Sequence, residues 1–157
     1  FGAWWWKERI TRAQAVAAAI WWARQGVGAA EMRGLLSERY GYDLSATVAE
    51  MASTDASKRF SALAHDTVPQ ALIIALEAES WEDAVVYSVE VGGDSDTLAA
   101  MSGAIAEARF GIAPAIAARA LKELPLEMQK VVTALYARAG LPFPWVTAPA
   151  PAVDSPA

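Results

Sequence analysis

Two carboxylates stand one residue apart in the stretch "EVGGDSDTLAAMSGAIAEA", residues 90–108, just ahead of an apolar helical pattern. Asp94 and Asp96 are followed by the hydroxyl of Thr97, so three hard oxygen atoms are available at one point of the chain. Such oxygens suit Mg²⁺, Mn²⁺ or Ca²⁺. The same residues are also preferred helix caps, because acidic side chains are favoured at helix N-termini. The residues alone leave both interpretations open.

The wider context resembles a known family. The string "VGGDSDTLAAMSGAIAEARFG" is similar to the late signature of the ADP-ribosylglycohydrolase family, which reads like G-G-D-[ST]-D-T-[IL]-A-A-x-x-G-A-I-A-x-A-x-x-G. The stretches at 13–24, 38–51 and 65–97 also resemble that family, in the expected order. The resemblance therefore extends over residues 10–125, most of the chain.

The resemblance implies an all-α fold with a two-metal Mg²⁺ or Mn²⁺ centre that hydrolyses the bond between ADP-ribose and an acceptor. By position, Asp94, Asp96 and Thr97 match metal ligands of the family. The neighbouring residues Gly92, Gly93 and Ser95 are then expected to lie against the substrate. Glycines in this loop can adopt positive φ and allow backbone to approach a ligand closely.

Two early motifs of the family have no counterpart in the sequence. One is a Gly-Asp-containing opening helix, and the other is a Thr-Asp-Asp-Thr metal block. Ahead of residue 13, "WWWKERITR" keeps only Glu8 of a family segment. We therefore expect an N-terminally truncated member with half of the metal ligands and no assignable catalytic acid or base. A self-associating, inactive binding or assembly protein is the alternative, and a fragment that pairs with a complete homologue is a third.

Five tryptophans near the N-terminus have two interpretations: Trp4, Trp5, Trp6, Trp21 and Trp22. Consecutive tryptophans cannot all face one core on a helix, so they either cover exposed core or form an interface. Because aromatic residues dominate interface hot spots, we expect a homo-oligomer that associates through this segment.

The single histidine, His65, lies just ahead of a helix that is expected to begin at an N-cap formed by Thr67. A loop or capping role is expected for His65, because its neighbour Asp66 should point elsewhere. An indirect role of Asp66 and Thr67 near the cation site is left open.

Apolar residues recur at helical spacing almost throughout, which predicts a compact all-α bundle. Ile10, Ala13, Ala17, Ile20 and Trp21 are expected to form one core-facing stripe. A second face is predicted from Leu98, Met101, Ile105 and Ala108, and the small residues Ser102, Gly103 and Ala104 should allow close helix packing. Ser80 is predicted to cap a helix with Asp83 in its first turn, and Gly41 and Gly111 to end helices.

Residues 1–140 are predicted to form one domain, followed by a Pro- and Ala-rich extended tail at 141–157. With 55% hydrophobic and 20% charged residues, the chain is expected to bury a substantial core. The net charge of −5 and the scattered basic residues argue against nucleic-acid binding. There is no cysteine and no apolar run of membrane-spanning length, so a cytoplasmic protein without membrane contact is expected.

Overall fold

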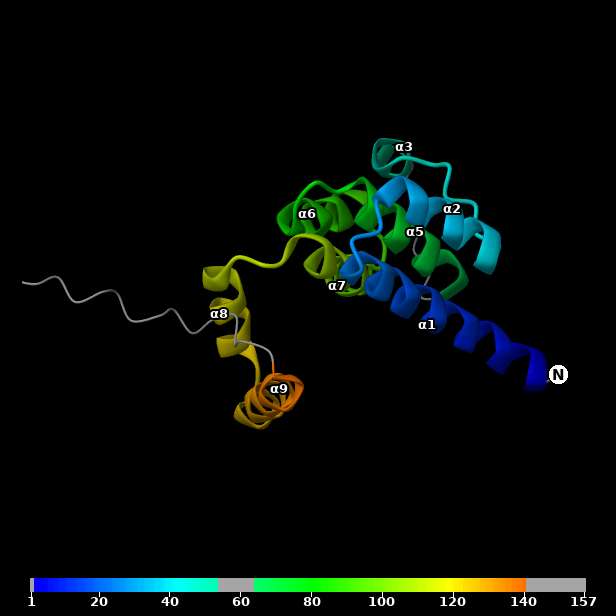
Figure 1. Ribbon diagram of the computed structural model, residues 1–157. Coiled ribbons are helices and arrows are strands. Elements are labelled where there is room, and N and C mark those ends of the chain that lie inside the picture. The colour runs from blue at the N-terminus through cyan, green and yellow to red at the C-terminus, as the bar shows by residue number, and fades with distance from the viewer. Residues whose placement is uncertain (1, 54–63, 141–157) are drawn as a thin grey trace, which may run out of the picture. The chain divides into compact units, whose positions relative to one another are not determined.

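The computed structural model describes the backbone of residues 2–53 and 64–140, and the described part is helical without strands, which confirms the all-α prediction (Figure 1). None of the described helices is long and apolar enough to cross a membrane. The helices are α1 (Gly2–Arg24), α2 (Ala29–Tyr40), α3 (Val48–Ser53), α5 (Ala64–Glu77), α6 (Trp81–Val91), α7 (Ser95–Phe110), α8 (Pro114–Glu123) and α9 (Leu126–Ala139).

Contacts group the chain into two compact units, Phe1–Gly111 and Ile112–Ala157. The first unit holds α1 to α7, and the second holds α8 and α9. The tail predicted at 141–157 lies outside the described residues. The single-domain boundary at residue 140 stays a prediction.

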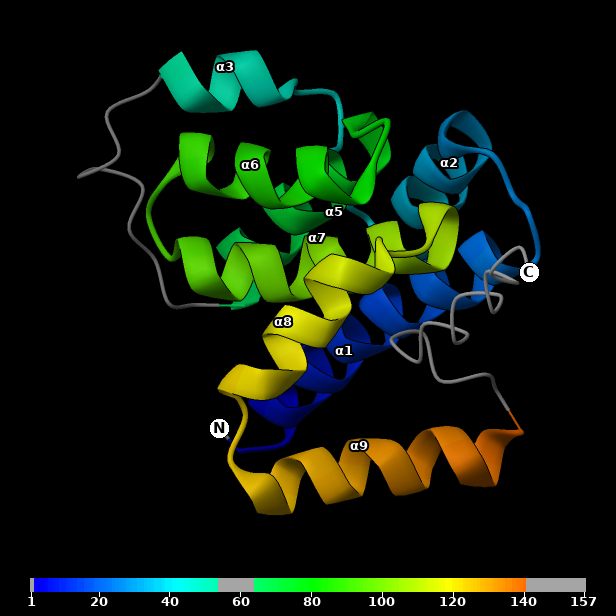
Figure 2. The ribbon, with the colours of Figure 1, turned by 90° about the vertical axis from the view of Figure 1, so that its left-hand side faces the viewer.

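Helix α7 is the central helix of the first unit, because it packs against α1, α5 and α6 (Figure 2). Leu98 and Ile105 are fully buried, and Met101 and Ala108 pack against the core beside them. The predicted apolar face of this helix is therefore confirmed.

The contact between α6 and α7 is close because small residues line it. The buried hydroxyls of Ser88 and Ser102 lie 2.9 Å apart, and Ser88 also donates to the Ala84 carbonyl at 2.7 Å. Gly103 is buried beside them, as the small-residue run predicts. Ala104, the third residue of that run, is instead exposed, because it lies on the opposite side of the helix turn.

Helices α5 and α7 run in the same direction, because two short connections at 78–80 and 92–94 reverse the chain twice. Arg109, at the end of α7, donates to the carbonyls of Ala75 and Ala78, the latter at 3.1 Å. These carbonyls lie at the end of α5, so the C-termini of the two helices are joined. Burial lowers the pKa of Arg109 below its ordinary value. The N-termini of α5 and α7 consequently share the opposite end of the unit.

The predicted stripe on α1 is wrong. Ile10 is 53% exposed and Trp21 is 60% exposed, whereas Ala15, Ala19 and Ala23 are buried. Both sides of this helix are rich in apolar residues, so their spacing could not select the inner one. The alanine side allows α1 to approach its neighbours closely, which favours its burial.

Local signals at helix ends are largely confirmed. The Ser80 hydroxyl accepts a hydrogen bond from the Asp83 amide at 3.0 Å, and Gly41 and Gly111 follow helices with positive φ. The predicted cap at Thr67 is wrong, because α5 begins at Ala64. Thr67 is buried within the helix instead, so the packing of this segment outweighs the local preference of threonine for a cap position. Pro69 consequently lies inside α5.

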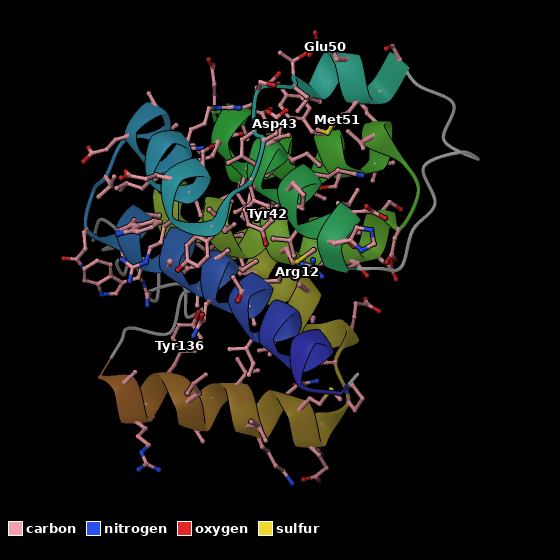
Figure 3. All side chains as sticks on the ribbon, turned by 90° about the vertical axis from the view of Figure 1, so that its right-hand side faces the viewer. Arg12, Tyr42, Asp43, Glu50, Met51 and Tyr136 are labelled. Carbon is pink, nitrogen blue, oxygen red and sulfur yellow. The ribbon has the colours of Figure 1, made fainter. Side chains whose placement is uncertain are left out.

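The short helix α3 is held by a reciprocal cap. The Thr47 amide donates to Glu50 Oε2 at 2.8 Å, and the Glu50 amide donates to Thr47 Oγ1 at 3.2 Å. The hydrogen bond from the Thr47 backbone lowers the pKa of Glu50. Glu77 of α5 additionally accepts from the Val48 amide at 2.9 Å. Figure 3 shows Glu50 on α3 and Asp43 in the loop that leads to it.

We expect Gly103→Ala to stabilise the protein by about 0.5–1 kcal/mol, because alanine is the better helix former. A Cβ at this position would lie 3.6 Å from Trp81 Nε1 and 3.9 Å from Val85 Cγ2, which are ordinary contact distances. Denaturant unfolding measures the change. Gly34→Ala, in a helix where a Cβ meets nothing within 4 Å, is the matched control and should give the same gain. A loss at Gly103 alone would contradict the described α6–α7 packing.

Candidate metal and substrate site

The loop between α6 and α7 depends on two consecutive glycines. Gly92 and Gly93 both have φ of 73°, a region that L side chains rarely adopt. The Gly92 amide donates to the Ser88 carbonyl at 3.3 Å and so ends α6. The two glycines turn the chain within three residues and place Asp94 at the start of α7.

Asp94 occupies the N-cap position of α7 without acting as a side-chain cap. Its carbonyl accepts from the Leu98 amide at 3.0 Å, but its carboxylate makes no capping hydrogen bond. The carboxyl group instead interacts with that of Asp96 and lowers the pKa of Asp96. The simple capping interpretation of Asp94 therefore does not describe this geometry.

Asp96 and Thr97 complete a small exposed group of oxygen atoms. Asp96 Oδ1 accepts from the Thr97 amide at 3.0 Å, and both side chains are exposed to solvent. The hydrogen bond with Asp94, followed by that from the Thr97 amide, lowers the pKa of Asp96. Ser95, the first residue of α7, is half-buried between the two aspartates in sequence. With its pKa lowered, the Asp96 carboxylate stays ionised and available to a cation at neutral pH.

The donor atoms fit part of a divalent-cation shell. Two carboxylates and one hydroxyl are the hard oxygen donors that Mg²⁺ and Mn²⁺ prefer, but a complete shell needs about six ligands. Among the residues whose side chains the structure describes, no group of three or more Asp, Glu, His or Cys is arranged to hold a metal ion. The oxygens of Asp94, Asp96 and Thr97 are therefore part of a cation shell and do not complete one.

The start of α5 lies at the same end of the unit as the start of α7. His65 Nε2 lies 3.0 Å from Asp66 Oδ1, and both side chains are partly exposed. The expectation that Asp66 points away from His65 is therefore wrong. With the helix beginning at Ala64, both residues belong to its first turn. An exposed imidazole–carboxylate pair thus shares one end of the unit with the Asp94–Thr97 segment.

The predicted tryptophan interface can be compared with the structure at two of its five residues. Trp4, Trp5 and Trp6 lie in α1, but their side chains are outside the described set. Trp21 is exposed, as an interface residue requires, whereas Trp22 is half-buried and packs against the core. An interface role of Trp21 stays a prediction.

Sequence reasoning missed Arg109, which joins the ends of α5 and α7. The sequence feature that could have indicated this role is the position of Arg109 four residues after Ile105, on the otherwise apolar face of the helix. A charged side chain on a buried face is expected only where it has partners. Here the partners are the last carbonyls of a helix, which favour a cation.

We expect Asp96→Asn to change the pH dependence of stability. Because the pKa of Asp96 is lowered in the folded state, its ionisation stabilises the fold above its unfolded pKa, and this contribution is lost as pH falls through the folded pKa. The difference in unfolding free energy between the natural chain and the variant should be constant near neutral pH and shrink below about pH 4. Denaturant unfolding across a pH series measures it, and a pH-independent difference would contradict the described hydrogen bonds.

The sequence of this chain matches a known protein family. The family model described as ADP-ribosylglycohydrolase matches residues 7–143, which include most of α1, the loop after α6 and all of α9. No curated protein and no solved structure gives a significant match. Since the matched region covers most of the sequence and contains the Gly92–Thr97 segment in its expected loop-to-helix setting, the chain belongs to the ADP-ribosylglycohydrolase family.

Proposed function

We propose that this chain contributes one side of a divalent-cation site for the hydrolysis of glycosidic bonds between ADP-ribose and an acceptor. The observation that carries the proposal is the geometry of Asp94. It stands at a helix N-cap, yet its carboxyl group lies against Asp96 and caps nothing. In a family of ADP-ribosylglycohydrolases, this arrangement is best explained by cation binding.

Asp94, Asp96 and Thr97 would hold Mg²⁺ or Mn²⁺ through their side-chain oxygens. A bound pair of cations would supply Lewis-acid polarisation and lower the pKa of a water, and would orient ribose hydroxyls. The backbone at Gly92 and Gly93 leaves room for a ligand to approach, because neither residue has a Cβ. Ser95 follows directly and would face the same ligand through its hydroxyl or amide.

The N-terminus of α7 favours the same ligand class on electrostatic grounds. Free backbone N–H groups and the helix dipole attract anions, including the diphosphate of ADP-ribose. The two aspartates oppose this attraction unless a cation neutralises them. Binding of ADP-ribose at this end of α7 should therefore depend on the metal.

The site needs further ligands, and these would come from residues outside the described set or from another chain. Hydrolysis by the chain on its own therefore depends on whether such ligands reach the Asp94–Thr97 segment. The acidic pair alone provides cation binding without a catalytic acid or base.

A second candidate function is assembly through α1. Ile10 and Trp21 are both more than half exposed on a helix whose other side is buried. Exposed apolar residues of this size on one helix are typical of an interaction surface. A protein of this kind would use the hydrolase fold for binding rather than catalysis.

Calorimetric titration with Mn²⁺, followed by ADP-ribose, tests the first proposal. Replacing both aspartates, Asp94→Asn with Asp96→Asn, removes the charge while asparagine still suits a helix start. We expect the affinity for Mn²⁺ to fall about tenfold or more. In metal sites, loss of a residue that only hydrogen bonds to a metal ligand already lowers metal affinity on the order of 10–100-fold. ADP-ribose should bind only with Mn²⁺ present.

Glu38→Gln, at an exposed position of α2, is the control for a general loss of negative charge. It should leave Mn²⁺ binding unchanged. Equal Mn²⁺ binding by the natural chain and the double variant would overturn the metal proposal. Metal binding without metal-dependent ADP-ribose binding would overturn only the substrate assignment.

For the second candidate, we expect Trp21→Glu to dissociate an oligomer, because a carboxylate in an apolar interface loses its hydration. Sedimentation velocity measures the oligomeric state. Trp22→Phe, which changes a half-buried residue conservatively, should leave it unchanged. A natural chain that is already monomeric at all concentrations would rule out this candidate.

A further inference from the structure

The outer side of α6 carries two exposed valines. Val86 is 51% exposed and Val89 is 65% exposed, whereas Ala84, Ser88 and Val91 on the inner side are buried. The helix packs against α3, α5 and α7 within the first unit (Figure 2). The two valines therefore lie on a face that the described part of this unit leaves open.

The stability of α6 itself does not explain these valines. β-Branched residues are weaker helix formers than Ala, Glu or Lys, because their side chains lose rotamer freedom in a helix. An exposed valine gains little burial in return. Val86 and Val89 are three residues apart, so their side chains are neighbours on one side of the helix. An apolar pair at such positions favours an interaction surface.

Carboxylates border the valines along the helix. Glu82 and Glu90 are exposed and stand four residues before and four residues after Val86, on the same side of α6. A lysine or arginine at such spacings would stabilise a glutamate, but α6 contains neither. Glu90 also lies in the last turn of α6, where the helix dipole disfavours a negative charge. A positive charge supplied from outside would relieve both effects.

The negative charge extends beyond the outer side of α6. Between Arg59 and Arg109 the sequence contains no Lys or Arg, although Asp and Glu recur throughout this stretch. Burial raises the pKa of Tyr87, and four neighbouring carboxylates raise it further: those of Asp83, Glu77, Glu79 and Glu90. The carboxylates around α6 therefore act together as one region of negative potential.

This potential selects the class of partner. Nucleic acids and anionic membranes would be repelled by the carboxylates. A second copy related by a two-fold axis would use the same patch on both subunits and would bring like charges together. A helix with Lys or Arg beside an apolar stripe would match both the carboxylates and the valines. Opposite charges would also speed its association.

We propose that the outer side of α6 binds a basic amphipathic helix of another protein. Apolar side chains of the partner cover Val86 and Val89, and its Lys or Arg side chains pair with Glu82 and Glu90. The inference concerns a protein–protein surface, and it depends neither on the proposed hydrolase function nor on a bound metal.

Fluorescence anisotropy with a labelled synthetic peptide tests the proposal. The probe is an amphipathic helix of leucine and lysine, and the comparison peptide has glutamate at every lysine position. The full chain is titrated in the presence of EDTA, so that cation binding at Asp94 and Asp96 does not contribute. We expect the lysine peptide to bind more tightly as salt decreases, and the glutamate peptide not to bind. No binding of the lysine peptide at low ionic strength would overturn the proposal.

The apolar contribution is tested by Val86→Ser with Val89→Ser. We expect the affinity for the lysine peptide to fall about tenfold, because two valines lose their apolar contacts. Val131→Ser with Leu135→Ser removes exposed apolar side chains of α9 and is the matched control, which should bind as the natural chain does. Circular dichroism checks that both variants keep their helices.

Equal affinity of the natural chain and the α6 variant would contradict the proposed surface. Loss of binding in the α9 variant alone would assign the peptide to α9 and would also overturn the proposal.

The charged contribution is tested by Glu82→Gln with Glu90→Gln. Affinity at low salt should fall several-fold, and its dependence on salt should become weaker. Glu31→Gln with Glu38→Gln makes the same change in net charge at exposed positions of α2 and is the control. Equal effects of the two pairs would indicate attraction by net charge alone and would refute the assignment to α6.

Sedimentation velocity separates this partner from a second copy of the chain. We expect Val86→Ser with Val89→Ser to leave the oligomeric state of the protein unchanged. A natural dimer that this variant dissociates would assign the outer side of α6 to self-association, and the proposal would then be wrong.

Discussion

The parallel pairing of α5 and α7 is the constraint that positions the candidate site. Arg109 joins their C-termini by donating to Ala75 and Ala78, and the small-residue contact between Ser88 and Ser102 holds α6 against α7. Both interactions are buried or half-buried, so each replaces hydration that the polar groups have lost. These contacts hold α7 against α5 and α6. The Asp94–Thr97 segment therefore stands at the start of a well-packed helix, although the side chains of Asp96 and Thr97 are exposed.

The two aspartates show why this helix start differs from an ordinary one. A single side-chain acceptor is enough to cap a helix, as Ser80 does for α6. At α7, the side chain of Asp94 interacts with that of Asp96 and lowers the pKa of Asp96. A divalent cation would compete with protons for the oxygens of both carboxylates. Metal affinity of the pair is then expected to increase with pH, by the linkage that holds for all ligands that must be deprotonated.

Local signals predicted much of the fold, whereas features set by distant residues were missed. The cap at Ser80 and the helix ends at Gly41 and Gly111 depend on neighbouring residues, and these predictions are confirmed. The inner side of α1 could not be predicted, because alanines and large apolar residues alternate around the helix and packing decides between them. Arg109 was missed because its partners lie 31 and 34 residues away in the sequence. For the site, the motif predicted which residues gather at the loop, but their metal role stays a prediction.

Family membership establishes the fold of this chain, but it does not establish catalytic activity. Catalysis depends on the ligands that complete the metal site. The candidate metal site lies at the start of α7, and the exposed residues Ile10 and Trp21 lie on α1. Since α1 contacts α7 through its alanine side, cation binding and association through its outer side use different atoms. Hydrolase and assembly roles are therefore physically compatible. If association brought carboxylates of a second chain to Asp94 and Asp96, assembly would itself become a condition for metal binding.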